Sequence, residues 1–232
     1  GNDALDGGAG TDRALFGGAA TNYGFALNGT SIVVTAISGT DGADTLSNVE
    51  ELSFGGTVMT LRQGTAANQP LNGANNVADL LLGFAGNDTL NGLTGNDMLL
   101  GDVGNDVLNG GGGRDVLAGG AGADRFVFIS AADSGLGAAA RDVIRDFELN
   151  VAGEVIDLSA IDARTGGGNN GDQAFTFIGG GNFTGGNANG GLRFFQQNGN
   201  TIIQGSTDND TQAEFEIELT GIRALTAGDF IL

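Results

Sequence analysis

Aspartate recurs at every ninth position in the middle of the chain, and an apolar residue follows two positions after each one. The aspartates are Asp79, Asp88, Asp97, Asp106, Asp115 and Asp124, and the apolar residues are Leu81, Leu90, Leu99, Leu108, Leu117 and Phe126. Evenly spaced carboxylates suit a repeated site for a hard divalent cation, because such cations prefer oxygen ligands. The strict nonapeptide period therefore predicts both a repetitive fold and a ligand.

The residues between the aspartates predict how they are positioned. Units from Gly83 to Val127 follow the pattern Gly-Gly-x-Gly-x-Asp-x-apolar-x, which is typical of calcium-binding RTX β-rolls. Glycine adopts positive φ without steric cost, so the glycine-rich part of each unit can form a tight turn and the remainder a short strand. Two units would close one coil of a flattened solenoid. We expect an all-β fold: a right-handed parallel β-roll flanked by antiparallel or meander β segments.

Units eighteen residues apart should stack at the ~4.8 Å spacing of neighbouring strands. This stacking places Asp88, Asp106 and Asp124 along one edge, and Asp79, Asp97 and Asp115 along the other. Stacked carboxylates repel each other unless a cation lies between them. Calcium, with 6–8 oxygen ligands at roughly 2.3–2.6 Å, fits such gaps better than magnesium. An isolated aspartate would more simply be a turn residue that bonds its own backbone, but repeats in register disfavour that alternative.

We expect about four calcium ions, in the gaps 88/106, 106/124, 97/115 and 79/97. The predicted ligands within the repeats are Asp79, Gly83, Ala85, Gly86, Asn87, Asp88, Gly92, Thr94, Gly95, Asn96, Asp97, Gly101, Val103, Gly104, Asn105, Asp106, Gly110, Gly112, Gly113, Asp115, Gly119, Ala121, Gly122 and Asp124. A partial repeat at the N-terminus adds Asp3 and Asp12. The unit 74–82 lacks both glycines and is expected to be a cap with a weaker site or none. A further copy at 39–47 is isolated, which favours a turn role for Asp44.

Composition excludes several classes of function. The chain has 232 residues and a net charge of −19, with no histidine and no cysteine, and all nine basic residues are arginine. The usual zinc ligands, a histidine-based triad and a thiol nucleophile are therefore missing, and we expect no enzymatic activity in these residues. The acidic surface argues against nucleic acid as a partner. No apolar run approaches the ~20 residues of a membrane span.

The pattern divides the chain into four parts. Residues 1–62 carry partial repeats and strand signals, 63–73 read as a connector around Pro70, 74–127 hold the regular β-roll, and 128–232 carry strand signals without repeats. In the last part, segments around Asn198-Gly199 predict a hairpin and a β-meander on the end of the roll. The motif Asp208-Asn-Asp210 is expected to be a polar turn. The chain begins in mid-motif, which indicates a fragment or processed product of a longer protein.

Residues 119–232 resemble the C-terminal domain of the serralysin family of secreted bacterial metalloproteases. The resemblance rests on segments that include Asp142-Val-Ile-Arg-Asp-Phe147, Val155-Ile-Asp-Leu-Ser159 and Phe215-Glu-Ile-Glu-Leu-Thr-Gly221. It implies a secreted or cell-surface protein of a Gram-negative bacterium, with a C-terminal signal for a type I secretion transporter that ends in Asp229-Phe-Ile-Leu232. The alternative is a final strand that merely closes the fold. The protease activity of the family is not implied, because this chain has no histidine.

Two other functions stay open at this point. The first is polysaccharide binding, as in the R-modules of alginate epimerases, with a stripe made by Arg114, Arg125, Arg141 and Arg145. The second is self-association into a surface lattice through calcium bridging between modules. The leading hypothesis is a calcium-binding module that folds outside the cell and carries the secretion signal of a larger secreted or surface-layer protein.

Overall fold

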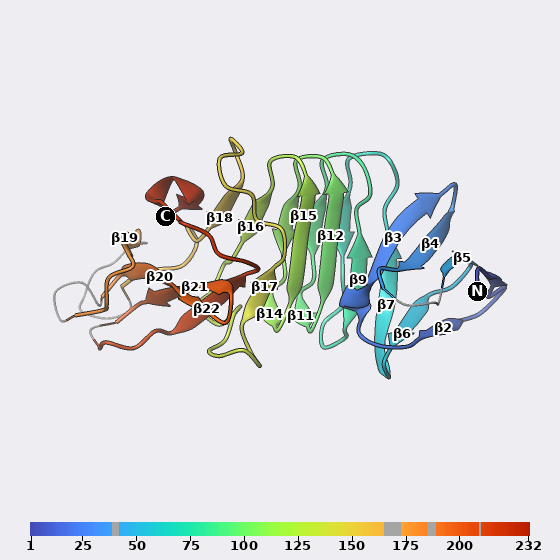
Figure 1. Ribbon diagram of the computed structural model, residues 1–232, viewed down its shortest axis with the longest axis horizontal. Helices are drawn as coiled ribbons and strands as arrows, with labels where there is room; N and C mark the ends of the chain where they lie inside the picture. The colour runs from blue at the N-terminus through green and yellow to red at the C-terminus, as the bar shows by residue number, and fades with distance from the viewer. Residues whose placement is uncertain (39–41, 165–172, 185–188, 209) are drawn as a thin grey trace.

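The computed structural model describes residues 1–38, 42–164, 173–184, 189–208 and 210–232. The molecule is elongated, with the two termini toward opposite ends and a stack of parallel strands between them (Figure 1). Apart from strands, the described ranges contain two 3-10 turns, η1 (Ala20–Asn22) and η2 (Ala227–Asp229), and no α-helix. Within the same ranges, no helix has the length and apolar character needed to cross a bilayer.

Two parallel sheets form the β-roll, and their register confirms the eighteen-residue coil. One sheet contains β9 (Asp79–Leu82), β12 (Met98–Val103), β15 (Val116–Ala121) and β17 (Asp142–Ile144). The other contains β8 (Pro70–Asn72), β10 (Thr89–Asn91), β13 (Val107–Asn109), β16 (Arg125–Val127), β18 (Val155–Asp157) and β23 (Phe230–Ile231). Leu81 pairs with Leu99 and Leu99 with Leu117, while β11 (Thr94–Gly95) and β14 (Gly112–Gly113) pair within the turns.

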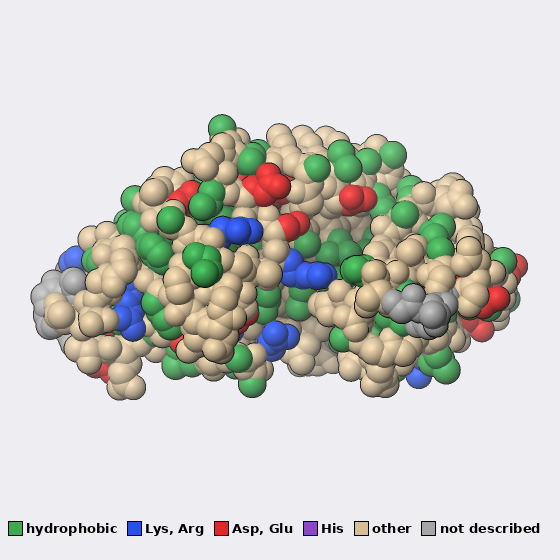
Figure 2. Space-filling model, viewed as in Figure 1, with side chains coloured by type: hydrophobic (Ala, Val, Ile, Leu, Met, Phe, Trp, Pro, Cys, Tyr) green, Lys and Arg blue, Asp and Glu red, His purple; other side chains and the backbone are tan. Residues whose placement is uncertain are grey.

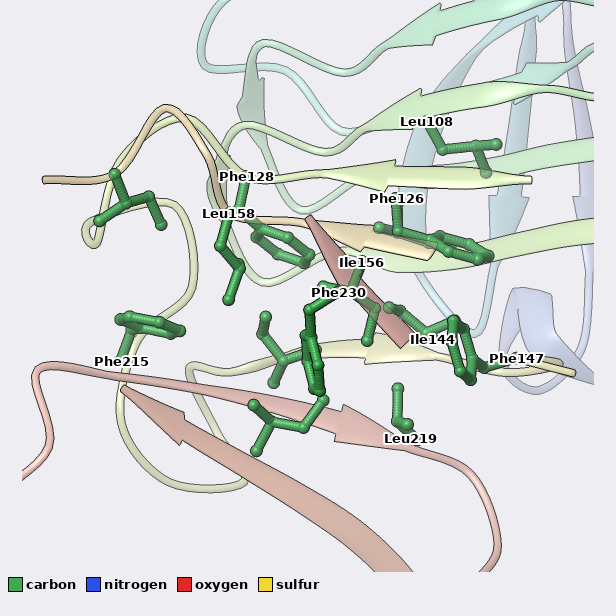
Figure 3. Close-up of a cluster of buried hydrophobic side chains, with 14 of the residues drawn as sticks. Leu108, Phe126, Phe128, Ile144, Phe147, Ile156, Leu158, Phe215, Leu219 and Phe230 are labelled. Atoms are coloured by element: carbon green, nitrogen blue, oxygen red, sulfur yellow. The ribbon is translucent and has the colours of Figure 1, made fainter. Parts of the chain in front are cut away.

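The core of the roll is a double row of apolar side chains between the sheets. The residue two positions after each aspartate points inward, and Leu81, Leu99 and Leu117 face Leu90, Leu108 and Phe126 with no exposed surface. The row continues beyond the repeats through Ile144, Ile156, Leu219 and Phe230 (Figure 3). Inward burial of one large apolar side chain per strand is what holds each short strand in place, at ~1.5–3 kcal/mol per side chain.

The C-terminal segment extends the roll sheets instead of packing as a separate unit. It contains β19 (Thr176–Gly179), β20 (Gly191–Gln197), β21 (Asn200–Ser206) and β22 (Phe215–Leu219). The predicted hairpin is present as the antiparallel pair β20 and β21, and β22 completes an antiparallel meander. Because β22 also pairs in parallel with β17, the meander is hydrogen-bonded to the last coil of the roll.

The N-terminal segment lengthens the roll sheet that contains β9 and β12, because its last strand pairs in parallel with β9, and it also covers the outer face of that sheet. Its strands are β1 (Ala4–Asp6), β2 (Arg13–Phe16), β3 (Tyr23–Asn28), β4 (Ser31–Ala36), β5 (Ala43–Ser47), β6 (Glu51–Phe54) and β7 (Thr57–Gln63). Outward side chains of the roll, such as Leu80, Leu82 and Met98, form a second core with residues of this segment, including Phe54. The stretch expected to be a connector contributes β8, which pairs with β10.

Candidate metal centres

Each array aspartate immediately precedes or begins a strand, so its side chain lies at the edge of the roll against the next coil. The backbone N–H of Asp88 donates to Oδ1 of Asp106 at 2.7 Å, and that of Asp106 donates to Oδ1 of Asp124 at 2.8 Å. On the other edge, Asp79 bonds Asp97 and Asp97 bonds Asp115 in the same way, both at 2.8 Å. The structure thus brings the predicted aspartates together in two ladders.

In four of these aspartates the second carboxylate oxygen is buried and lacks a hydrogen bond within the described residues. The Oδ2 atoms of Asp88, Asp97, Asp106 and Asp115 have no hydrogen-bond partner among the described residues, although the side chains are at most 2% exposed. Burying a carboxylate oxygen without a partner is costly, and a metal ion is one of the few ways to compensate it. These orphaned oxygens therefore fit a row of bound cations.

Glycine at the first position of each repeat leaves room in front of the carboxylate. A Cβ atom placed on Gly92 would lie 2.5 Å from both Oδ2 of Asp97 and the carbonyl oxygen of Gly110 in the next coil. On Gly83, the corresponding atom would lie 2.8 Å from Oδ2 of Asp88 and from the carbonyl oxygen of Gly101. Carboxylate and carbonyl oxygens from successive coils thus converge, and this is the donor set that calcium prefers.

Electrostatics disfavour the charged array when no cation is present. Burial, with added repulsion from neighbouring aspartates, raises the pKa of Asp97 to about 7 and that of Asp106 to about 6. Burial also raises the pKa of Asp115 to about 7. The pKa values of Asp88 and Asp124 are raised by burial as well. A cation between the carboxylates would reverse this penalty by favouring their charged form.

The remaining predicted turn residues have other contacts. The asparagines at the fifth position of the repeats connect successive turns: Oδ1 of Asn87 accepts from the N–H of Asn105, and Oδ1 of Asn105 accepts from that of Ala123, both at 2.9 Å. The carbonyl oxygens of Val103 and Ala121 accept from Gly86 and Gly104 in the preceding coil. Of the backbone groups named as ligands, the carbonyls of the first glycines Gly92, Gly101, Gly110 and Gly119 lie close to the Oδ2 atom of an aspartate in the preceding coil. On the other edge, Oδ1 of Asn96 accepts from the backbone N–H of Arg114 at 2.9 Å in the same way.

Both ladders continue past the regular repeats, which sequence analysis missed. The N–H of Asp115 donates to Oδ1 of Asp142 at 2.7 Å, and that of Asp124 donates to Oε2 of Glu154 at 2.7 Å. A signal for the first existed, because the nine-residue aspartate period runs on through Asp133 to Asp142. Glu154 does not fall in that period, so no sequence pattern indicated its position in the ladder.

The two ladders begin differently at the N-terminal side of the array. Gln69 lies in the coil before that of Asp88. Its backbone N–H donates to Oδ1 of Asp88 at 2.9 Å, and its side-chain amide donates to the same oxygen at 3.3 Å. Asp79 has no exposed surface; its Oδ2 accepts from the N–H of Ala74 at 2.7 Å, and Nε of Arg62 lies 3.6 Å from its Oδ1. The Gln69 amide and the Arg62 guanidinium thus occupy the positions at which the regular repeats would supply another carboxylate.

The N-terminal partial repeat is completed by a distant segment. The N–H of Asp3 donates to Oδ1 of Asp44 at 2.9 Å, and that of Asp12 donates to Oε2 of Glu50 at 3.0 Å. Because β1 and β5 pair in parallel, Asp44 stacks on Asp3 as the array aspartates stack on each other. The expectation that Asp44 is an isolated turn residue is therefore wrong, since its repeat is adjacent in space to the first. Positions 39–41 of that repeat lie outside the described residues.

The four arginines considered for a polysaccharide stripe are largely engaged with the protein itself. Arg141 is 5% exposed and forms ion pairs with Glu216 at 2.9 Å and Glu218 at 2.6 Å. Arg125 is paired with Asp157, Arg114 donates to the carbonyl oxygen of Ala138, and Arg145 donates to that of Thr21. The spacing in sequence did not reveal these internal partners. Arg141 in particular cannot reach a polymer at the surface.

Asp208 and Asp210 lie at bends in the chain close to Glu214, and Asn209 of the predicted polar turn lies outside the described residues. Carboxylate oxygens of Asp208, Asp210 and Glu214 lie within 4.8 Å of one another. The N–H of Asp210 donates to Oδ1 of Asp208 at 2.8 Å, and that of Gln212 donates to Oδ1 of Asp210 at 2.7 Å. These are the local side-chain to backbone bonds of a polar turn.

Comparison with known proteins identifies two sequence families. The model for the peptidase M10 serralysin C terminal matches residues 17–232, and that for the RTX calcium-binding nonapeptide repeat matches residues 1–14. No curated protein matches the chain.

Three similar solved structures come from two bacteria. The R3 subunit of the Azotobacter vinelandii mannuronan C5-epimerase AlgE6 is 26% identical, with a TM-score of 0.40 over 72% of this chain and 80% of that one. The R2 subunit of the same epimerase is 26% identical, with a TM-score of 0.38 over 74% and 92% of the respective chains. The extracellular lipase LipA of Serratia marcescens is 16% identical, with a TM-score of 0.29 over 100% of this chain and 34% of the lipase.

Proposed function

The chain belongs to the peptidase M10 serralysin C-terminal family and binds calcium, and from this premise we propose that it is a calcium-folded export module of a secreted or surface protein. It acts by binding and folding, not by catalysis. The observation that carries the proposal is the row of buried Oδ2 atoms in the two ladders, which lack hydrogen-bond partners among the described residues. We assign the ions to the gaps 88/106, 106/124, 97/115 and 79/97, with Asp3 and Asp12 as ligands of a separate N-terminal site.

Calcium would supply most of the driving force for folding. Each repeat buries about one leucine, worth ~1.5–3 kcal/mol, against a backbone entropy cost of ~1–2 kcal/mol for each ordered residue. Extracellular calcium sites typically have dissociation constants of about 10⁻⁴–10⁻³ M, so they would be empty in the cytosol and filled outside. The chain would therefore cross the envelope unfolded and fold on arrival.

The C-terminus would serve as the signal that a type I transporter reads. Phe230 and Ile231 form the last strand, β23, and Phe230 is 7% exposed in the core of the folded molecule. A transporter could therefore read this residue freely only before folding. This order of events agrees with export of an unfolded, calcium-free chain.

Export can be tested in a cell that carries a type I transporter. Deletion of residues 229–232 is expected to abolish export while the chain still accumulates inside the cell. The matched variant Asp106→Ala keeps this C-terminus, so it should be exported but yield less folded protein outside. Normal export of the truncated chain would show that these residues are only a structural strand.

Calcium-dependent folding can be tested separately on the purified chain. Addition of millimolar calcium should produce a cooperative gain of β-sheet circular dichroism, and a chelator should reverse it. A chain that is equally folded in both conditions would contradict the proposal.

A further inference from the structure

Asparagine followed directly by glycine is a site of spontaneous covalent change, and the sequence contains seven such pairs. The backbone nitrogen of the glycine can attack Cγ of the asparagine side chain, because glycine has no side chain to hinder the approach. The new N–C bond closes a succinimide ring, and the side-chain nitrogen leaves as ammonia with the proton of the attacking nitrogen. Water then opens the ring to leave aspartate or isoaspartate. Four of the seven pairs lie in two opposite structural settings, two in each.

In the first setting, the pair lies at the end of a β-roll strand. Asn72 is the last residue of β8 and Asn91 the last residue of β10. The N–H of Gly73 donates to the carbonyl oxygen of Asn91 at 2.8 Å, and that of Gly92 donates to the carbonyl oxygen of Asn109 at 2.9 Å. In addition, Nδ2 of Asn91 donates to Oδ1 of Asn72 at 3.2 Å. The attacking nitrogen and the side-chain amide are thus both held by hydrogen bonds, so ring closure requires the coil to open.

In the second setting, the pair lies at the tip of a hairpin. Asn28 ends β3 before the turn to β4, and Asn198 lies in the turn between β20 and β21. Asn198 has a φ of 53°, and Gly29 and Gly199 have φ values of 66° and 83°. All four residues of the two pairs are exposed. The N–H groups of Gly29 and Gly199 donate to no acceptor among the described residues, so no ladder bond has to break before the attack.

We propose that the fold directs asparagine deamidation in this protein. Asn28 and Asn198 are modification sites of the folded chain, whereas Asn72 and Asn91 react only when the coils of the roll are open. The distinction between the two settings follows from the hydrogen bonds alone. Only the role of calcium rests on the proposed function, since a chain that is unfolded without calcium would expose all four sites.

Reaction at Asn91 would strike the array itself. Isoaspartate at this position inserts a methylene group into the backbone directly before Gly92. A single added Cβ atom on Gly92 would already lie 2.5 Å from Oδ2 of Asp97, so this part of the coil has no space for a displaced backbone. A chain that stays unfolded before export would therefore lose a metal gap with time, and folding protects it.

The test follows the four pairs in the full chain by peptide mass spectrometry during incubation at mildly alkaline pH. One sample contains millimolar calcium, one contains a chelator, and one contains a chelator and concentrated urea. In calcium, Asn72 and Asn91 are expected to react at least about tenfold more slowly than Asn28 and Asn198 in the same molecules. In urea, all four should react at similar rates. The hairpin pairs are the internal control for pH and temperature.

The outcomes separate this proposal from the proposed function. Equal rates at Asn91 and Asn198 in calcium overturn it, as does an Asn198 that reacts in urea but not in calcium. A slow Asn91 that stays slow in urea also overturns it, because the cause would then be the local sequence. In the chelator alone, a chain that stays folded and keeps Asn91 slow contradicts calcium-driven folding but supports protection by the ladder.

Discussion

Asp97, Asp106 and Asp115 each divide their two carboxylate oxygens between two tasks. Oδ1 accepts the backbone N–H of the aspartate in the preceding coil and so fixes the stacking register. Oδ2 is left for a ligand in the gap. The side chain is therefore both a structural acceptor and a metal ligand, and substitutions that spare one task can separate the two.

Position along the ladder should decide how much an aspartate matters. Asp106→Ala is expected to raise the calcium midpoint of folding more than Asp79→Ala, because Asp106 borders two gaps and Asp79 begins its ladder beside Arg62. An ion at 100 times its dissociation constant stabilises the fold by about 2.7 kcal/mol, so the loss of a second gap should be measurable. Calcium titrations followed by circular dichroism give both midpoints. Equal shifts would count against the stacking register.

Acid should partly replace calcium. Burial raises the folded-state pKa of Asp106 to about 6 and those of Asp97 and Asp115 to about 7, well above the unfolded value near 3.8. Such groups stabilise the calcium-free fold fully below the unfolded pKa, and this stabilisation is lost as pH rises through 6–7. The chain in chelator should therefore show more β structure at pH 5 than at pH 8. Saturating calcium should abolish the difference; a calcium-free chain that is better folded at pH 8 would refute this account.

The glycine in front of each carboxylate should be sensitive to a single methyl group. Gly92→Ala would place a Cβ atom 2.5 Å from Oδ2 of Asp97 and from the carbonyl oxygen of Gly110, so we expect a marked loss of calcium affinity. Gly112→Ala is the matched control in the same array, since its Cβ would lie 3.7 Å from the Thr94 side chain. Competition with a calcium-sensitive dye measures both affinities. Similar calcium affinities for the two variants would show that the space between Gly92 and the Asp97 carboxylate is not part of a metal site.

At the scale of elements, the two outer faces of the roll are chemically different. Strands of the β9 sheet carry apolar outward residues, such as Leu80, Leu82 and Met98, whereas β10 carries the exposed Thr89 and the half-buried Asn91. The apolar face is covered by the N-terminal strands, and the polar one is not. Alternate nonapeptides therefore have different roles although their aspartates are equivalent.

This difference predicts which outward residues stabilise the fold. Leu82→Ala is expected to cost about 2–5 kcal/mol of unfolding free energy in calcium, because Leu82 is 1% exposed in the second core. Thr89→Ala, on the exposed face, should stay within about 0.5 kcal/mol of the wild type. Denaturant unfolding measures both. Comparable costs would mean that the N-terminal strands do not pack on this face in solution.

The regular elements followed from the sequence, and the irregular ones did not. The nine-residue period in the sequence predicted the positions of β9 to β16 and of the inward leucines. It could do so because the turn glycines, the strand residues and the aspartates all repeat with the same spacing. The covered outer face was readable only as an eighteen-residue pattern in residues such as Leu82 and Leu100, which the nine-residue pattern obscured. Asp44 and Glu50 reach the N-terminal partial repeat, and Glu154 reaches a ladder, from positions about 30 to 40 residues away in the sequence. Contacts over such separations are not encoded by a local pattern.

At the scale of the whole molecule, one solenoid runs from the repeats into the C-terminal segment. The inner row of Leu81, Leu99 and Leu117 passes to Ile144 and Leu219, and the facing row passes to Ile156 and Phe230. In such an array each coil contacts its neighbours, so stability adds along the axis and the last coils cap the stack. Calcium binding would therefore be coupled to the order of the C-terminus.

Calcium ions between the stacked aspartates can be detected most directly in a crystal structure determined in millimolar calcium, with an anomalous difference map. We expect peaks between Asp88 and Asp106, between Asp106 and Asp124 and between Asp97 and Asp115, with a weaker one between Asp79 and Asp97. Gaps that hold only water, or hydrogen bonds that close on the Oδ2 atoms without an ion, would contradict this expectation.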